Sequence, residues 1–137
     1  MIEVTAAIIR NPETGRILVC QRPPRKQYGL LWEFPGGKTE PGESAEQCLR
    51  RECMEELNLE LEETIPFCKE MHDGIEVQFF LCPMSLNALT FMVDREHNAL
   101  AWVSRSELKN YRFCPSDASM LKRADMDEIF GDKTVAE

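Results

Sequence analysis

The features that place a chain in a membrane or outside the cell are missing from this sequence. No apolar run approaches the roughly 18 residues that a membrane-spanning helix needs. The first residues also lack the basic and then apolar pattern of a signal peptide. We therefore expect a cytoplasmic protein with no membrane partner.

The sequence also lacks paired cysteines and an excess of basic residues, which disfavours metal-thiolate sites and binding to a nucleic-acid duplex. No two cysteines have the C-x-x-C spacing of a zinc or redox site, so we expect reduced thiols in the core. The cysteines are Cys20, Cys48, Cys53, Cys68, Cys82 and Cys114. The formal net charge is −8, so the basic excess that a nucleic-acid duplex requires is also lacking. A small polyphosphate ligand is compatible with this charge if metal ions and a few local cations assist.

The composition that is present is that of a globular protein. The chain has 137 residues, of which 43% are hydrophobic and 29% are charged. It contains no linker, internal repeat or low-complexity segment, and its length suffices for one proper core. We predict a single domain over residues 1–137.

The pattern of apolar residues, turns and caps predicts strands around two main helices. Strands are expected at 2–10, at 16–22, in the short segment 32–38 that ends in a tight glycine turn, in a hairpin within 64–84 and at 99–104. The hairpin turns at Asp73-Gly74. Helices are expected at 44–57, with Asn58 as a left-handed C-cap, after Ser104 or Ser106, and at 115–130. This order predicts an α/β sandwich.

Three carboxylates crowd onto one side of the 44–57 helix. Glu52 faces both Glu55 and Glu56, and each like-charged pair costs about 0.2–0.5 kcal/mol in an isolated helix. On a helical wheel the acids point where the apolar residues point, so a solvated acidic face explains them less well than a bound divalent cation. Arg51, four residues before Glu55, is expected to hold one acid but not three.

The spacing of residues 37–59 defines a motif. It runs Gly37, five residues, Glu43, seven residues, Arg51-Glu52, Cys53, one residue, Glu55-Glu56, one residue, Asn58 and Leu59. This pattern resembles the Nudix box at every defined position except one, where Asn58 replaces a glycine. Asparagine tolerates a left-handed backbone best among the other residues, so the replacement affects helix termination more than chemistry.

The resemblance extends over most of the chain. The segment "WEFPGGK" is similar to the MutT-type branch of the Nudix family, and "EHNALAWVS" with "FCPSDASML" is similar to its bacterial CTP pyrophosphohydrolases. The resemblance implies an α/β/α sandwich around a mixed β-sheet. It also implies Mg²⁺-dependent hydrolysis of a nucleoside triphosphate to the monophosphate and pyrophosphate, with Mn²⁺ as a substitute metal.

The resemblance also assigns roles to individual residues. It implies Glu52 as metal ligand and base-side carboxylate, and Glu96 as a second candidate base, although Glu96 fits an exposed loop acid equally well. The metal ligands implied are Glu52, Glu55, Glu56 and the backbone carbonyl of Gly36. The remaining assignments are Arg51 among the catalytic residues, Gly37 and Glu43 as supports of the box, and Arg22 and Lys38 as phosphate contacts or, alternatively, surface ion pairs.

Asp117 is the residue that we expect to choose the base. An ionised carboxylate only accepts hydrogen bonds, which suits the exocyclic amine of cytosine, but an Asp at a helix start is also an ordinary cap. Phe34 and Phe113 are candidates for stacking on the base or for the core. Three functions stay open: a pyrophosphohydrolase for cytidine nucleotides, a diphosphatase for oxidised guanine nucleotides, and a nucleotide-sensing module without turnover. The number of metal ions and the choice between monomer and homodimer stay open as well.

Overall fold

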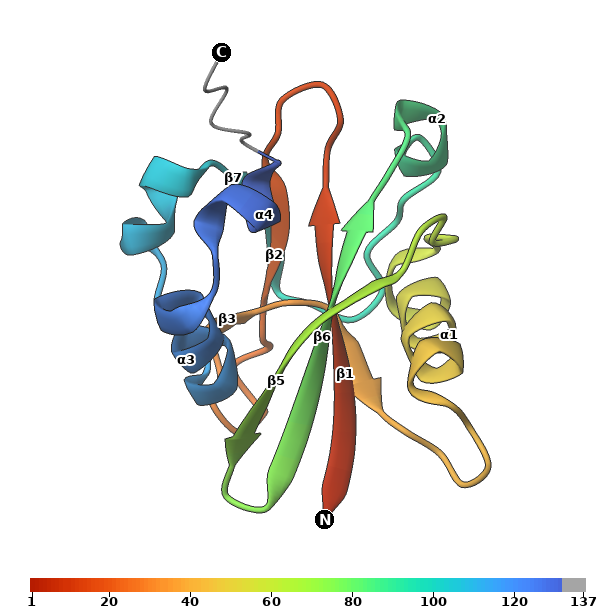
Figure 1. The fold of residues 1–137 in the computed structure, drawn as a ribbon, viewed down its shortest axis with the longest axis vertical. Coiled ribbons are helices and arrows are strands. Elements are labelled where there is room, and N and C mark those ends of the chain that lie inside the picture. The colour runs from red at the N-terminus through yellow and green to blue at the C-terminus, as the bar shows by residue number, and fades with distance from the viewer. Residues whose placement is uncertain (132–137) are drawn as a thin grey trace.

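One mixed β-sheet with helices against both faces forms the protein (Figure 1). A computed structural model describes residues 1–131. Its strands are β1 (Ile2–Arg10), β2 (Ile17–Gln21), β3 (Trp32–Glu33), β4 (Gly36–Lys38), β5 (Ile65–His72), β6 (Ile75–Pro83) and β7 (Ala99–Val103). Its helices are α1 (Ala45–Leu57), α2 (Leu86–Leu89), the 3₁₀ helix η1 (Arg105–Asn110), α3 (Pro115–Arg123) and α4 (Met126–Phe130). None of these helices is long and apolar enough to cross a bilayer.

The sheet is organised around β1. The strand order is β3-β2-β1-β6-β5, with β4 paired to β1 and β7 paired to β2. β1 runs parallel to β6 along its whole length and antiparallel to β2 and β4. β4 pairs with the first half of β1, at Val4 to Ala6, whereas β2 pairs with its last residue, Arg10. β1 thus has β4 as its antiparallel neighbour along its first half and β2 at its end.

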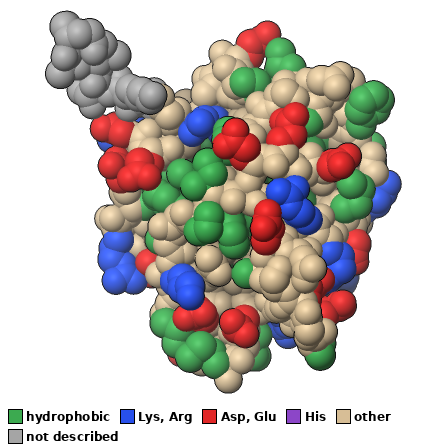
Figure 2. Space-filling model, turned by 45° about the vertical axis from the view of Figure 1, so that its right-hand side comes forward, with side chains coloured by type: hydrophobic (Ala, Val, Ile, Leu, Met, Phe, Trp, Pro, Cys, Tyr) green, Lys and Arg blue, Asp and Glu red, His purple; other side chains and the backbone are tan. Residues whose placement is uncertain are grey.

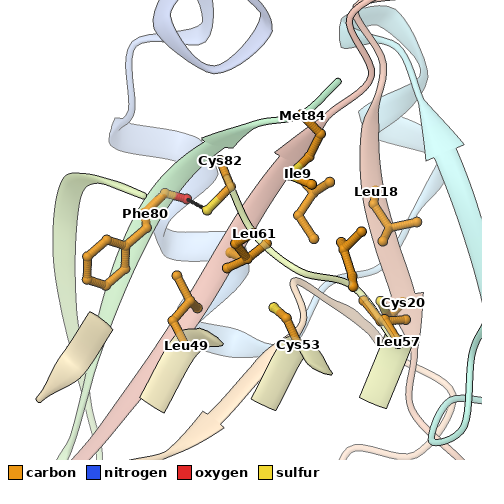
Figure 3. Close-up of a cluster of buried hydrophobic side chains, with 12 residues drawn as sticks. Ile9, Leu18, Cys20, Leu49, Cys53, Leu57, Leu61, Phe80, Cys82 and Met84 are labelled. Atoms are coloured by element: carbon orange, nitrogen blue, oxygen red, sulfur yellow. Dashed lines mark hydrogen bonds between the residues drawn. The ribbon is translucent and has the colours of Figure 1, made fainter. Parts of the chain in front are cut away.

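Alternating side chains of β1 and β2 give the sheet two apolar faces. One face packs against α1, where Leu49, Cys53 and Leu57 meet Ile9 and Leu18 (Figure 3). The other face packs against α3 and α4 through a separate cluster that contains Ile8, Ile17, Val19, Met120 and Ile129. In Figure 1, α1 lies on one side of the sheet, and α3 and α4 lie on the other. The predicted α/β sandwich is confirmed.

Local signals in the sequence set most element ends. Ser44 caps α1 through the backbone N–H of Gln47, and the Gln47 side chain bonds back to Ser44. Asn58 ends the helix in the left-handed region, with φ 52° and ψ 40°, as predicted. Asp73 and Gly74 form the predicted turn between β5 and β6, both with positive φ. All six cysteines are free thiols, as expected.

Three predictions of local structure were wrong. The helix expected at 115–130 breaks at Ala124, because Asp125 accepts a hydrogen bond from Asp127 N and caps a second helix, α4. The glycines expected in a tight turn lie in β4, where a Cβ on Gly36 would stand 1.9 Å from the carbonyl oxygen of Thr5. The short helix α2 was not predicted at all.

Candidate active site

A cleft of about 870 Å³ lies beside α1 and β4 and reaches the start of α3. Most residues that the sequence singled out line it. They are Arg22, Phe34, Gly36, Gly37, Lys38, Glu52, Glu55, Glu56, Glu96 and Asp117. Arg51, Glu43 and Phe113 are not among its lining residues. The structure thus brings the helix acids, the glycine segment and the α3 terminus to one site.

Glu52 lies directly over the glycine strand β4. A Cβ atom on Gly37 would stand 2.0 Å from the Oε2 atom of Glu52, so only glycine leaves room for this carboxylate. Glu56, one helical turn later, is mostly buried next to Glu52. Burial, followed by the hydrogen bond and charge of Glu52, raises the pKa of Glu56 to about 9.

Arg51 bonds two of the three helix acids, Glu52 and Glu55, where we expected one, and it also bonds Glu43. Its Nε and Nη2 atoms bond both oxygens of Glu43, at 2.7 and 3.0 Å, and its Nη1 atom lies 2.6 Å from Glu52 and 2.8 Å from Glu55. The planar guanidinium carries five N–H donors, which explains why one arginine serves so many carboxylates. The bond to Arg51 is the main cause that lowers the pKa of Glu43 to about 2. Arg51 therefore contacts the acids from outside the cleft.

The donor set at this end of the cleft consists of oxygens, which is what Mg²⁺ prefers. Within residues 1–131, no three His, Cys, Asp or Glu side chains gather closely enough to hold a metal ion by themselves. Glu52 and Glu56 hydrogen-bond to each other, and Glu55 is held by Arg51. These residues fit a metal that uses one or two carboxylates and completes its shell with water and substrate phosphate oxygens.

Glu96 and Lys26 form an ion pair at the mouth of the cleft. The pair joins the loop after β2 to the loop before β7. The Lys26 ammonium holds the pKa of the Glu96 carboxyl below its ordinary value. Glu96 is thus placed near the helix acids, as a second candidate base requires, and it carries a partner that the sequence did not reveal.

His97 is a site residue that the sequence analysis missed. Its side chain is 2% exposed and its Nε2 atom lies 3.4 Å from Glu56 Oε1. Its Nδ1 atom lies 3.0 Å from Asp94 Oδ1. The available signal was slight: His97 is one of two histidines in the chain and directly follows Glu96.

The two expected phosphate contacts differ in their surroundings. Arg22 bonds Glu33 at 2.9 Å and the Gln27 carbonyl at 2.8 Å, so its guanidinium is engaged by its own loop and strand β3. Lys38 is exposed on the cleft wall and forms no ion pair with any carboxylate in the described part of the chain. Of the two, only Lys38 presents a charge without a competing protein partner.

Asp117 closes the far end of the cleft. It is 7% exposed, in the first turn of α3, and its Oδ1 atom accepts a hydrogen bond from the backbone N–H of Phe34 at 3.2 Å. Burial, reinforced by the nearby charge of Glu33, raises the pKa of Asp117 to about 8. The Asp117 carboxyl group therefore takes up a proton far more readily than an ordinary aspartate, which the expectation of an ionised acceptor did not consider.

The two phenylalanines occupy different positions. Phe34 is buried and lines the cleft, while Phe113 stacks on it with ring centroids 5.8 Å apart and does not line the cleft. Phe34 also contacts Phe79 of the apolar cluster edge to face. Phe34 can meet a base directly, whereas Phe113 supports it from behind.

Comparison with known proteins agrees with this geometry. The family model described as the NUDIX domain matches residues 1–130. The chain belongs to the Nudix family. It is similar to the CTP pyrophosphohydrolase of Escherichia coli K12, with 39% identity over 89% of this chain and 90% of that protein. It is also similar to the 8-oxo-dGTP diphosphatase of Haemophilus influenzae, with 37% identity over 90% of both chains.

Solved Nudix structures share the fold. A MutT structure, from work on Aliivibrio salmonicida and Vibrio cholerae, aligns with a TM-score of 0.75 and 31% identity over 96% of this chain and 98% of that one. The solution structure of the E. coli ORF135 protein aligns with a TM-score of 0.71 and 35% identity, over 100% and 95% of the two chains. The predicted resemblance to the MutT-type branch is confirmed, and the protein is a Nudix hydrolase. Nudix hydrolases act on nucleotide substrates and generally use divalent metals such as Mg²⁺.

Proposed function

We propose that this protein is a Mg²⁺-dependent nucleoside triphosphate pyrophosphohydrolase that prefers CTP, dCTP or a modified deoxycytidine triphosphate. The observation that carries the proposal is the placement of Asp117 in the same cleft as Glu52 and Glu56. One end of the cleft offers carboxylates for a metal-bound triphosphate, and the other offers a buried carboxyl group for a base.

At the α1 end, the protein's own residues position water and phosphate. A bound Mg²⁺ would polarise phosphoryl oxygens and lower the pKa of an attacking water. Glu52 and Glu56, with the Gly36 carbonyl, are the ligands that we assign, and Glu55 would join them by leaving Arg51. Glu52, or Glu96 as the alternative, accepts the proton of the water, and Lys38 neutralises the leaving phosphates.

At the α3 end, hydrogen bonds select the base. The Phe34 N–H occupies Oδ1 of Asp117, which leaves Oδ2 for a ligand. Oδ2 can donate to ring N3 of cytosine when it is protonated, and it can accept from the exocyclic amine when it is ionised. The carboxylate of Glu33, held by Arg22, is a second acceptor on the same wall. This set suits a base edge that presents an amine beside a ring nitrogen.

Oxidised guanine triphosphates are a second candidate substrate. The same protonated Oδ2 can donate to a guanine carbonyl, which an ionised carboxylate could not do. The similarity to the H. influenzae 8-oxo-dGTP diphosphatase points in the same direction. The raised pKa of Asp117 is therefore the specific observation that keeps this candidate open.

We do not propose that the protein binds a nucleic-acid duplex. On the face shown in Figure 2, acidic and basic side chains are interspersed and form no continuous basic stripe. The formal charge of −8 points the same way.

Pyrophosphate release from a panel of triphosphates tests the proposal. The panel contains CTP, dCTP, 5-substituted dCTP, UTP, ATP, GTP and 8-oxo-dGTP, each with Mg²⁺, with Mn²⁺ and with EDTA. We expect the largest kcat/KM on a cytidine triphosphate and no release with EDTA. Glu52→Gln, purified in parallel, controls for contaminating phosphatases. Orthophosphate in place of pyrophosphate, or a purine triphosphate as the best substrate, would overturn it.

A further inference from the structure

His97 lines the cleft, yet its side chain is almost fully buried. The ring is 2% exposed and sits between two carboxyl groups, Asp94 at Nδ1 and Glu56 at Nε2, at 3.0 and 3.4 Å. Asp94 Oδ1 also accepts the backbone N–H of His97 at 3.2 Å. Asp94 therefore fixes both the backbone and the ring, and the free edge of the ring faces Glu56.

The loop that carries His97 is fastened to the end of α1. The backbone N–H of Arg95 bonds the carbonyl of Glu56 at 2.7 Å, and the N–H of Val93 bonds the carbonyl of Leu57 at 2.9 Å. These bonds bring the loop to the residue whose side chain His97 contacts. The placement of the ring is thus set by main-chain bonds rather than by a flexible side chain.

Among Glu52, Glu55 and Glu56, Glu56 is the acid that Arg51 does not hold. Arg51 contacts Glu43, Glu52 and Glu55. Across the described residues, the basic side chain that lies next to the Glu56 carboxyl group is His97, at 3.4 Å. A carboxylate in a metal site requires a neighbour that orients it, and loss of such a neighbour commonly costs about 10- to 100-fold in metal affinity.

We propose that His97, oriented by Asp94, is a positioning residue that holds the Glu56 carboxylate in the orientation that receives a divalent cation. The inference rests on the proposed function, since it assumes that Glu56 is a metal ligand. His97 does not touch the substrate or the metal. It acts through Glu56 in the way that Arg51 acts through Glu52 and Glu55.

Binding of Mn²⁺ to the full chain without nucleotide, followed by electron paramagnetic resonance, tests this role. His97→Leu keeps most of the ring volume and removes both nitrogens, and we expect Mn²⁺ affinity to fall by about tenfold or more. His97→Gln retains a nitrogen near the Nε2 position and should recover part of the loss. Asp94→Ala removes the carboxylate that contacts the ring and accepts the backbone N–H groups of Glu96 and His97, and it should give an intermediate loss.

Arg95→Ala is the matched control. Its side chain bonds the Met54 carbonyl and Asn58 in the same loop contact but does not reach the Glu56 carboxylate. We expect Mn²⁺ affinity within about twofold of wild type. The melting temperature of each variant without metal distinguishes a loss of folding from a loss of metal binding. If His97→Leu does not fold, His97→Gln and Asp94→Ala still test the role of His97.

The outcomes separate this inference from the proposed function. Wild-type affinity in His97→Leu, with Glu52→Gln still impaired, overturns the role of His97 and leaves the metal site intact. Absence of Mn²⁺ binding by the wild type overturns both. An equal loss in Arg95→Ala would also overturn the inference, because loop packing alone would then account for the effect.

Discussion

At the α1 end of the cleft, several carboxyl groups bond to one arginine. At the α3 end, a single carboxyl group is buried without such a partner. Arg51 bonds Glu43 and lowers its pKa to about 2, while desolvation raises the pKa of Asp117 to about 8. The first arrangement keeps acids charged for metal and phosphate chemistry that any triphosphate shares. The second keeps an acid neutral, which lets it bond an uncharged base. Under the proposed function, this difference would place reactivity at one end and specificity at the other.

Glu56 is the exception at the α1 end. Burial beside Glu52 raises its pKa to about 9, as burial does for Asp117. A divalent cation would reverse this shift because the positive charge favours the ionised form.

Replacement of Glu52 should have the largest effect. Glu52→Gln keeps the volume and removes a charged ligand, and we expect turnover to fall by about a hundredfold or more while the fold is retained. Mg²⁺ should raise the melting temperature of the wild type more than that of the variant. More than about a tenth of wild-type activity at saturating Mg²⁺ would contradict the role of Glu52.

Loss of the multiple hydrogen bonds around Arg51 should have the next largest effect. Arg51→Lys keeps the charge but cannot bond three carboxylates at once, so we expect about a 10- to 100-fold loss of kcat. The free energy of unfolding should fall by about 1–3 kcal/mol, which urea titration measures. Arg50→Lys, on the same helix but paired with Glu46, is the control and should retain kcat. Equal losses in both variants would show that Arg51 only stabilises α1.

The neutral state of Asp117 makes a prediction about pH. The pKa of Asp117 is about 8 in the folded state, and its ordinary value is 3.8. Between these two pH values the folded state holds a proton that the unfolded state has lost. This contribution to stability is complete below about pH 4 and is lost as the pH rises through about 8. The amide side chain in Asp117→Asn does not titrate. The melting temperature of the variant minus that of the wild type should therefore increase from about pH 5 to about pH 9, by at least about 4 °C. A constant difference would mean that Asp117 is ionised throughout.

Lys38 should give the smallest effect, because it is exposed. Lys38→Ala should weaken nucleotide binding by up to about fivefold, and the deficit should grow from the monophosphate to the triphosphate. Calorimetric titration of CMP, CDP and CTP in Ca²⁺ measures it. Lys69→Ala, on β5, provides the control. Equal deficits for all three nucleotides would reduce Lys38 to a general surface charge.

The sequence predicted the α1 end better than the α3 end for a physical reason. Glu52, Glu55 and Glu56 lie on one helix, so their spacing alone brings them together. Asp117 and Phe34 meet through a bond between residues 83 positions apart in the sequence. Spacing within one helix cannot reveal how deeply a side chain from a distant segment will be buried, and so Asp117 was expected to be ionised.

The contacts that were missed have the same origin. His97 reaches Glu56 because main-chain bonds dock its loop on α1, and Lys26 reaches Glu96 across two loops. Arg51 was underestimated because Glu43, eight residues earlier, comes within reach only after the chain turns at the start of α1. The Ser44 and Asn58 caps of α1 and the Asp73-Gly74 turn depend on near neighbours, and these were predicted correctly.

The ratio of kcat/KM for CTP to that for 8-oxo-dGTP, measured in wild type and in Asp117→Asn, tests most directly whether the α3 end alone selects the base. In the variant, Phe34 N–H still occupies the oxygen, so the cleft gains an amide nitrogen that only donates. We expect the ratio to fall by about 5- to 150-fold, which corresponds to about 1–3 kcal/mol, because kcat/KM for CTP decreases. An unchanged ratio, accompanied only by a shift in melting temperature, would contradict the division between a reactive end and a selective end.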